Sequence, residues 1–262
     1  MIIDGHQHVL KNVAEQIEIN RSCSIDKVIL FSTVVHPEIA NHKAEFVEEM
    51  NKLNKILRGE LNPKEERLKA IDELISAVNT APDYFIGFGS CPFGLNMDET
   101  AEWIENNIVG NHLKGVGEIA LAPGMVASIE TLLSYIHDHK KRLPVWIHTF
   151  NPMTLTDLKQ IVQYARKYHN TKFILGHAGG SHWLELIEMV KDLTNVYVDI
   201  SASFTVFSVK YIAEALPERC VFSSDLPYGD PLLSIKQIEH LIKDIHIREN
   251  ILGNNTATLL NS

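Results

Sequence analysis

The chain has 262 residues, of which 45% are hydrophobic and 22% are charged, the proportions of an ordinary globular protein. Its formal net charge of -9 argues against a nucleic-acid partner and against an anionic membrane surface. No apolar stretch is long enough to span a bilayer, and no cleavable apolar leader precedes the first apolar run. The three cysteines, Cys23, Cys91 and Cys220, lie far apart, which favours reduced thiols in a cytoplasmic protein over a disulfide framework.

Eight short apolar runs alternate with segments of helical character. The runs are Ile2–Gly5, Val28–Ser32, Tyr84–Gly89, Leu113–Glu118, Val145–His148, Phe173–Gly176, Val196–Ile200 and Val221–Ser224. This alternation predicts parallel strands with right-handed crossovers, and eight such units predict an α/β fold of the (β/α)8 TIM-barrel type. An open doubly wound sheet is the alternative, but it calls for a Gly-rich phosphate turn that is missing after the first run. No linker divides the chain, so we expect one domain over residues 1–262.

The longest connection, residues 36–81, predicts a two-helix insertion between strands two and three. Apolar residues repeat at helical spacing in both halves: Phe46, Met50, Leu53 and Leu57 in the first, and Leu68, Ile71, Ile75 and Val78 in the second. Asn62-Pro63-Lys-Glu65 predicts the start of the second helix, and Thr154-Leu-Thr-Asp157 predicts a later helix start. The insertion is either outer-ring packing with one extra helix, a cap over the barrel mouth, or a contact in a homodimer.

Metal-binding side chains stand at or next to the ends of five of these runs. His6 and His8 lie two residues apart, so they point to the same face of the first strand. The others are Glu118, His148, His177 and Asp225. Each residue alone has an ordinary structural explanation, but the strand ends of a barrel meet at one rim, where the six would converge. Imidazole and carboxylate donors together suit zinc and its transition-metal neighbours, so we expect a divalent metal, zinc first, as one or two ions.

These residues and the sequence around them resemble the amidohydrolase superfamily of metal-dependent TIM-barrel hydrolases, in its amidohydrolase-related (amidohydrolase 2) branch. The resemblance rests on the segments IDGHQH, IHTF, GHAGG, SSDLPYG and ILGNNTATLL, and covers nearly the whole chain. The segment KGVGEIAL is similar to TatD-like hydrolases. Many relatives carry a carboxylated lysine on strand four. Here Glu118 occupies that position and Lys114 lies four residues earlier, so we expect no modified lysine.

The resemblance implies two arrangements of the site. In the binuclear form, the first-strand histidines and Asp225 hold one ion, His148 and His177 hold the other, and Glu118 bridges them. This form implies that activated water cleaves a small amide, lactone, ester or phosphoester, with Asp225 accepting the proton. In the mononuclear form, one later histidine joins the first-strand pair and Asp225, and the remaining histidine, such as His177, acts as acid or base. That form implies a non-oxidative decarboxylase of a carboxylated ring compound.

Other classes fit the pattern less well. A structural zinc site is normally closed by four protein ligands and often uses cysteine, whereas this chain offers six donors. A TatD-like nuclease is disfavoured by the acidic balance of the chain. We therefore expect a small molecule as the substrate.

Position alone suggests the side chains that contact the substrate. The candidates follow strands three, five, six and eight and are Phe93, Phe150, His182, Trp183 and Tyr228. Aromatic lining is common in small-molecule pockets, although rim aromatics also pack against neighbouring loops. Asp4 shares the face of the first-strand histidines, and it either orients an imidazole or is a buried carboxylate satisfied by backbone groups. Cys91 has no partner base in view, so we treat it as a buried thiol and not as a nucleophile.

Overall fold

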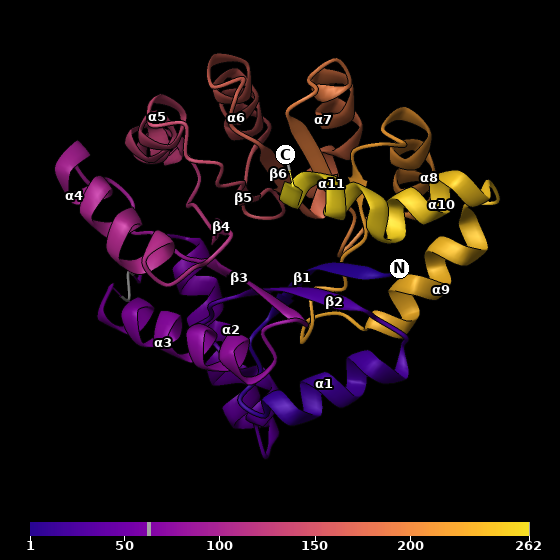
Figure 1. The fold of residues 1–262 in the computed structure, drawn as a ribbon, viewed down its shortest axis with the longest axis horizontal. Helices are drawn as coiled ribbons and strands as arrows, with labels where there is room; N and C mark the ends of the chain where they lie inside the picture. Colours follow the sequence, from indigo (N-terminus) through magenta and orange to yellow (C-terminus); the bar gives the residue numbers. More distant parts are fainter. Residues whose placement is uncertain (62–63, 262) are drawn as a thin grey trace.

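Eight parallel strands form the centre of the molecule in the computed structural model, which describes residues 1–61 and 64–261 (Figure 1). The strands are β1 (Ile3–His8), β2 (Lys27–Phe31), β3 (Phe85–Gly89), β4 (Gly115–Ile119), β5 (Val145–His148), β6 (Phe173–Gly176), β7 (Val196–Asp199) and β8 (Cys220–Val221). They lie side by side in chain order. The ends of the sheet meet where Gly5 N donates to Phe222 O at 2.9 Å and His8 N donates to Leu226 O at 2.8 Å. The predicted TIM barrel is confirmed.

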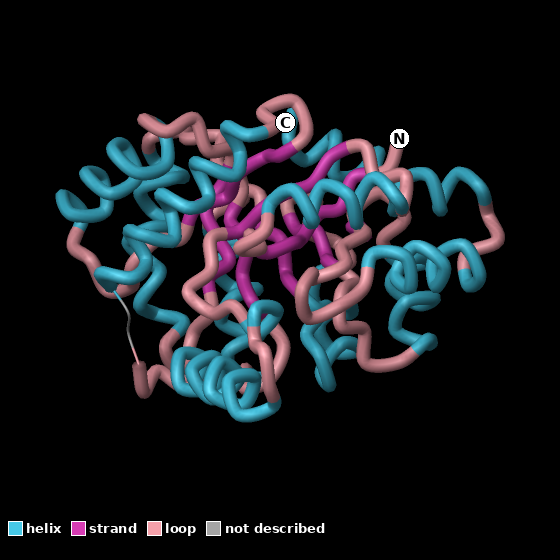
Figure 2. The backbone as a smooth tube through the Cα atoms, turned by 90° about the horizontal axis from the view of Figure 1, so that it is seen from below, coloured by secondary structure: helices cyan, strands magenta, loops and turns pink. Residues whose placement is uncertain are grey.

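Helices surround the barrel. They are α1 (Val13–Ser22), α2 (Lys43–Leu57), α3 (Lys64–Thr80), α4 (Met97–Trp103), α5 (Glu130–Asp138), α6 (Leu155–Lys167), α7 (Trp183–Val190), α8 (Val206–Ala215), α9 (Pro231–Leu241), α10 (Ile245–Glu249) and α11 (Asn255–Asn261). Short 3-10 or π-helical segments are η1 (Pro37–Ile39), η2 (Ile104–Val109), η3 (Val126–Ile129), η4 (His177–His182) and η5 (Asn250–Asn254). Figure 2 shows both termini on the same side of the molecule, where α11 contacts β1 and β8.

The predicted bounds of the first and last strands were wrong. β1 continues to His8 because Gln7 and His8 still pair with Leu30 and Phe31 of β2. β8 ends at Val221 because the chain beyond it turns toward β1, where Asp225 N donates to His6 O at 2.8 Å. Both differences bring the metal-binding candidates of these two strands closer to each other.

Large apolar and aromatic side chains fill the barrel interior. Phe31, Phe88 and Trp146 are fully buried, and their ring centroids lie 5.2–6.3 Å apart. The His6 ring packs edge-on against Phe31 at 4.7 Å and against Trp146 at 5.3 Å. A layer of buried aromatic rings therefore packs against the first histidine and fixes the direction of its ring.

The two helices of the insertion have different roles. α3 packs against β2 and β3 through buried Ile71, Leu74 and Ala77, so it is the ring helix of this unit. α2 is the extra helix: it buries no residue completely, yet Leu53 and Leu57 line the central pocket. The insertion therefore caps one side of the barrel mouth. Leu68 shares the helical spacing of Ile71 but is 42% exposed, so the apolar repeat extends beyond the packed face of α3. The predicted helix start at Asn62 and Pro63 lies outside the described residues.

Two further expectations concern the chain as a whole. Within the described ranges, no helix is long and apolar enough to cross a membrane. All three cysteines are free, and Cys91 and Cys220 are buried. Burial raises the pKa of the Cys91 thiol to about 12, which keeps it protonated at neutral pH. These thiols therefore act as small apolar side chains.

Candidate metal centre

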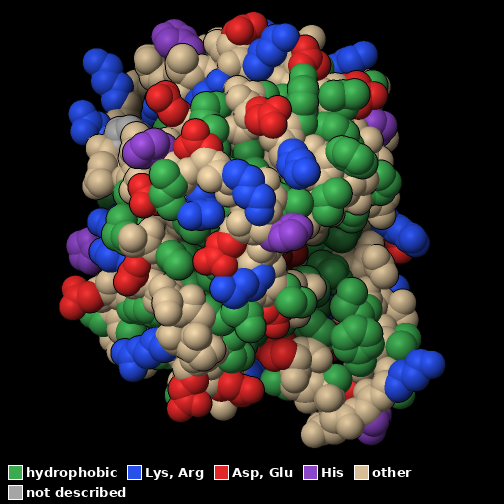
Figure 3. Space-filling model, turned by 90° about the vertical axis from the view of Figure 1, so that its right-hand side faces the viewer, with side chains coloured by type: hydrophobic (Ala, Val, Ile, Leu, Met, Phe, Trp, Pro, Cys, Tyr) green, Lys and Arg blue, Asp and Glu red, His purple; other side chains and the backbone are tan. Residues whose placement is uncertain are grey.

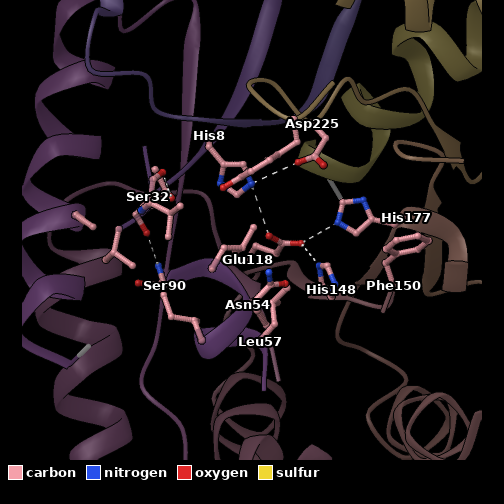
Figure 4. Close-up of a pocket in the computed structure, with 18 of the residues that line it drawn as sticks. His8, Ser32, Asn54, Leu57, Ser90, Glu118, His148, Phe150, His177 and Asp225 are labelled. Atoms are coloured by element: carbon pink, nitrogen blue, oxygen red, sulfur yellow. Dashed lines mark hydrogen bonds and ion pairs between the residues drawn. The ribbon is translucent and has the colours of Figure 1, made fainter. Parts of the chain in front are cut away.

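All six predicted donors converge at the carboxyl ends of the strands. Five of them, all except His6, line the pocket shown in Figure 4. β1 supplies His6 and His8, β4 supplies Glu118 and β5 ends on His148, while His177 and Asp225 follow β6 and β8. Three overlapping groups have ligand atoms within 4.8 Å of one another: His6, His177 and Asp225; His6, His8 and Glu118; and Glu118, His148 and His177. Residues more than 200 positions apart in the sequence thus share one site.

Glu118 lies between two pairs of histidines. One carboxylate oxygen, Oε1, lies 3.0 Å from His148 Nδ1 and 3.1 Å from His177 Nε2. The other oxygen, Oε2, lies 3.8 Å from His6 Nε2 and 3.7 Å from His8 Nε2. Each oxygen of this carboxylate therefore faces its own pair of imidazoles, which is the position required of a bridging ligand.

Asp225 completes the group on the side of the first strand. Its Oδ1 lies 3.4 Å from His8 Nε2 and 3.8 Å from His6 Nε2. Asp225 has a φ of 61° and His177 a φ of 62°, both in the left-handed region that few residues other than glycine adopt. Such conformations cluster at functional sites. Here they occur at two of the six metal-binding candidates.

Neighbouring carboxylates change the protonation of the histidines. Burial alone would lower the pKa of His6, but the negative charges of Glu118, Asp225 and Asp199 raise it to about 10. Despite burial, the charge of His6 and hydrogen bonds with His148 and His177 hold the pKa of Glu118 well below its usual range. The hydrogen bond with His8 and the charges of nearby histidines lower the pKa of Asp225. The carboxylates thus favour a positive charge at the imidazole nitrogens that face them.

A second set of polar groups fixes the orientation of two of these imidazoles. Asp199, the last residue of β7, lies with Oδ2 3.1 Å from His6 Nδ1. Ser201 Oγ lies 2.8 Å from His177 Nδ1. These contacts leave Nε2 of each ring directed toward the centre of the site, as metal-binding histidines require. Sequence reasoning missed both residues, although Asp199 lies one residue before the end of the predicted run Val196–Ile200.

Asp4 does not orient an imidazole, so that alternative was wrong. Its oxygens accept hydrogen bonds from His6 N at 3.1 Å, Ser224 N at 2.9 Å and the Gln7 amide at 2.8 Å. Asp4 therefore joins the backbone of β1 to the segment after β8. Burial raises the pKa of its carboxyl to about 6 against the effect of these hydrogen bonds.

A cavity of about 300 Å³ opens above the donors. Of the predicted substrate contacts, Phe150 and Tyr228 line it. Phe93, His182 and Trp183 are not among its described lining residues: Trp183 packs against Tyr211 at 5.9 Å, and Phe93 lies under Arg67. Ser32 and Thr33 after β2 and Ser90 after β3 also line the cavity, and no sequence pattern marked these three residues beforehand.

A family model described as Amidohydrolase matches residues 3–261. The chain belongs to the amidohydrolase family. No curated protein sequence matches it significantly. The predicted family resemblance is therefore confirmed over nearly the whole chain.

Solved structures with the same fold come from several enzymes. The 5-carboxyvanillate decarboxylase LigW from Sphingomonas paucimobilis is similar at 14% identity and a TM-score of 0.69, covering 99% of this chain and 98% of its own. A protein described as a probable 2-pyrone-4,6-dicarboxylic acid hydrolase from Acinetobacter baumannii has 12% identity and a TM-score of 0.67, covering 100% and 99%. A dihydroxybenzoic acid decarboxylase from Polaromonas sp. JS666 with bound manganese has 16% identity and a TM-score of 0.64, covering 99% and 96%. At these identities, the likeness shows the fold.

The residues of this amidohydrolase fit a divalent metal. His6 Nε2 is buried and has no hydrogen-bond partner among the described residues, although it faces two carboxylates. A buried imidazole nitrogen without a partner is costly, whereas a metal ion would satisfy it. Four imidazoles and two carboxylates form a donor set typical of zinc, manganese or iron. Lys114 is exposed just before β4 and stands apart from this group.

Proposed function

We propose that this amidohydrolase is a metal-dependent hydrolase that cleaves a small amide, lactone, ester or phosphoester. The observation that carries the proposal is the position of Glu118, with each carboxylate oxygen facing its own pair of histidines. A mononuclear site would leave this shared carboxylate without a clear role. When bound, divalent metal would lower the pKa of a water molecule and polarise the scissile carbonyl or phosphoryl group.

Each of the six residues would have a role in binding metal. The first-strand histidines and Asp225 would hold one ion, His148 and His177 would hold the other, and Glu118 would contact both. Zinc is our first choice because nitrogen and carboxylate donors suit it, and manganese, which the Polaromonas enzyme binds, is the second. Asp199 and Ser201 would keep their histidines in the orientation that binding requires.

Asp225 is the residue best placed to move the proton. Its carboxylate lines the pocket, and its lowered pKa leaves it ionised at neutral pH. It can therefore accept a proton from the attacking water at one oxygen and return it to the leaving group. If one ion only is bound, His177, whose pKa is raised against burial by Glu118 and Asp225, takes part in the same proton transfer.

Replacing Asp225 with asparagine tests this role. We expect Asp225→Asn to lower kcat for an ester or lactone by at least about 100-fold, since the amide cannot accept the proton. The measurement is steady-state hydrolysis together with metal content. Asp83→Asn, at an exposed aspartate, is the matched control and should hydrolyse normally. Substantial hydrolysis by Asp225→Asn would remove its role as the base.

A decarboxylase is the second candidate, because two of the similar structures described above are decarboxylases of carboxylated rings. The two reactions differ in their products. Hydrolysis in water enriched in oxygen-18 places the label in the product, whereas decarboxylation releases carbon dioxide and leaves the product unlabelled. Mass spectrometry of a turned-over substrate therefore separates the candidates.

A further inference from the structure

The pocket has a polar wall that the metal centre does not use. Arg67, near the start of α3, and Ser90, directly after β3, both line the cavity. Each has a buried polar atom without a hydrogen-bond partner among the described residues, namely Arg67 Nε and Ser90 Oγ. Buried polar atoms in native proteins are nearly always paired, so two such donors in one pocket indicate a place for a ligand.

The positive charge of Arg67 is not neutralised within the described parts of the chain. Its guanidinium makes no ion pair there, and the neighbouring Glu66 pairs instead with Lys52 at 2.9 Å. The Phe93 ring lies 5.1 Å from the guanidinium carbon and holds the group by a cation–π contact. A guanidinium remains protonated at neutral pH even when partly buried. The Arg67 guanidinium therefore places a fixed positive charge, without a neutralising partner, beside the cavity.

The other residues that line the cavity limit the kinds of ligand that fit beside Arg67. Arg67 is the one lysine or arginine among the described residues that line the pocket. Much of the remaining wall is apolar and comes from Val35, Leu53, Leu57 and Phe150. One fixed cation beside an apolar wall matches a single carboxylate on an apolar body. A phosphate dianion would leave one of its two negative charges without a partner at this wall.

We propose that Arg67 and Ser90 bind a carboxylate of the substrate, so that this enzyme acts on carboxylated molecules with an apolar body. The inference rests on the proposed function, since it gives the substrate class of the same site. Figure 4 shows Ser32 and Ser90 on the opposite side of the pocket from His177 and Asp225. The bound carboxylate is therefore a recognition group remote from the bond that reacts. Phe93, predicted to touch the substrate, instead positions Arg67.

Binding of benzoate and of its neutral analogue benzamide tests the proposal without turnover. We expect Arg67→Met to weaken benzoate about 10- to 100-fold, the loss typical of a charge-assisted hydrogen bond, and to leave benzamide unchanged. Ser90→Ala should weaken benzoate by a smaller factor. The measurement is a dissociation constant from NMR titration. Arg58→Met, at the exposed arginine after α2, is the matched control. Equal benzoate affinity in wild type, Arg67→Met and Ser90→Ala would overturn the proposal.

A metal ion could also bind benzoate, so the titration is repeated in His6→Ala. There we expect the ion of the first-strand site to be lost while benzoate binding still depends on Arg67, which separates this inference from the proposed function. If His6→Ala abolishes benzoate binding and Arg67→Met leaves it intact, the carboxylate binds metal and the inference is wrong. Phenyl phosphate provides the comparison of ligand class. If phenyl phosphate binds more tightly than benzoate and this binding depends on Arg67, the ligand of Arg67 and Ser90 is a phosphate and the inference is wrong.

Discussion

At the scale of single residues, the account depends on how the imidazoles are held. His6 is completely buried, packs against two aromatic rings and contacts Asp199 through Nδ1. Packing fixes the ring plane, and the contact of Nδ1 with the Asp199 carboxylate leaves Nε2 as the nitrogen that faces the metal-binding candidates. Metal affinity should therefore depend on a residue that cannot itself reach the metal.

Asp199→Asn tests this dependence. The amide keeps the shape of the side chain but loses the charge that favours the required tautomer, so we expect metal affinity to fall about 10- to 100-fold. Competition with a chelator measures the affinity. Asp192→Asn, at the exposed aspartate before β7, should bind metal as the wild type does. Unchanged affinity in Asp199→Asn would show that packing alone orients His6.

The convergence of the six side chains could be predicted from sequence because each stands at or next to the end of an apolar run, and strand ends share a rim. Asp199 carried a similar signal, since it lies one residue before the end of the predicted run Val196–Ile200 and ends β7, but it was not singled out. Arg67 could not be predicted. Its place in the pocket depends on how α3 packs against the sheet and on the contact with Phe93, and neither is encoded in local spacing.

At the scale of elements, helix caps position the loops that surround the site. Thr154 and Asp157 form a reciprocal capping box at the start of α6, and Asp157 Oδ1 also accepts from Gly124 N at 2.8 Å. One side chain therefore joins the helix after β5 to the loop after β4. Both of these strands supply metal-binding candidates, so the cap supports the site as well as the helix.

Asp157→Ala should destabilise the fold by about 1 kcal/mol at pH 7, the usual effect of losing a cap. Burial alone would raise the pKa of Asp157, but hydrogen bonds from Thr154 and Gly124 lower it below its ordinary value. The stabilisation is thus present above the ordinary aspartate pKa and is lost as the pH falls through the lower folded value. Urea unfolding across this range measures it. Asp72→Ala, at an exposed α3 residue, is the control. A pH-independent difference for Asp157→Ala would contradict the account.

The bounds of a strand were predicted correctly where burial alone determines them. The bounds predicted for the fifth and sixth strands match β5 and β6, because these short runs are buried on both faces. The prediction for β8 failed because the segment after Val221 bonds to β1, and such pairing has no local signature. Similarly, the sequence showed that the insertion has two helices but did not show which one packs on the sheet.

At the scale of the whole molecule, the barrel brings residues that are distant in the sequence into one site. The insertion forms part of the pocket wall. Figure 3 shows a face on which acidic and basic side chains are mixed and hydrophobic side chains gather beside a hollow. Exposed apolar residues occur on α2, at Phe46 and Val47, and near the starts of α8 and α9, at Phe207 and Leu233. A homodimer contact through the insertion stays a prediction.

The central claim is a metal centre in which Glu118 is shared. The most direct measurement is the metal content per chain of protein purified without chelator, for the wild type and for Glu118→Gln. We expect about two transition-metal ions per wild-type chain, as for a bridged site, and one or fewer in the variant, since an amide is a poor bridging ligand. An equal count of one in both proteins would contradict the shared site. No metal in the wild type, even after zinc or manganese is added, would contradict the metal centre itself.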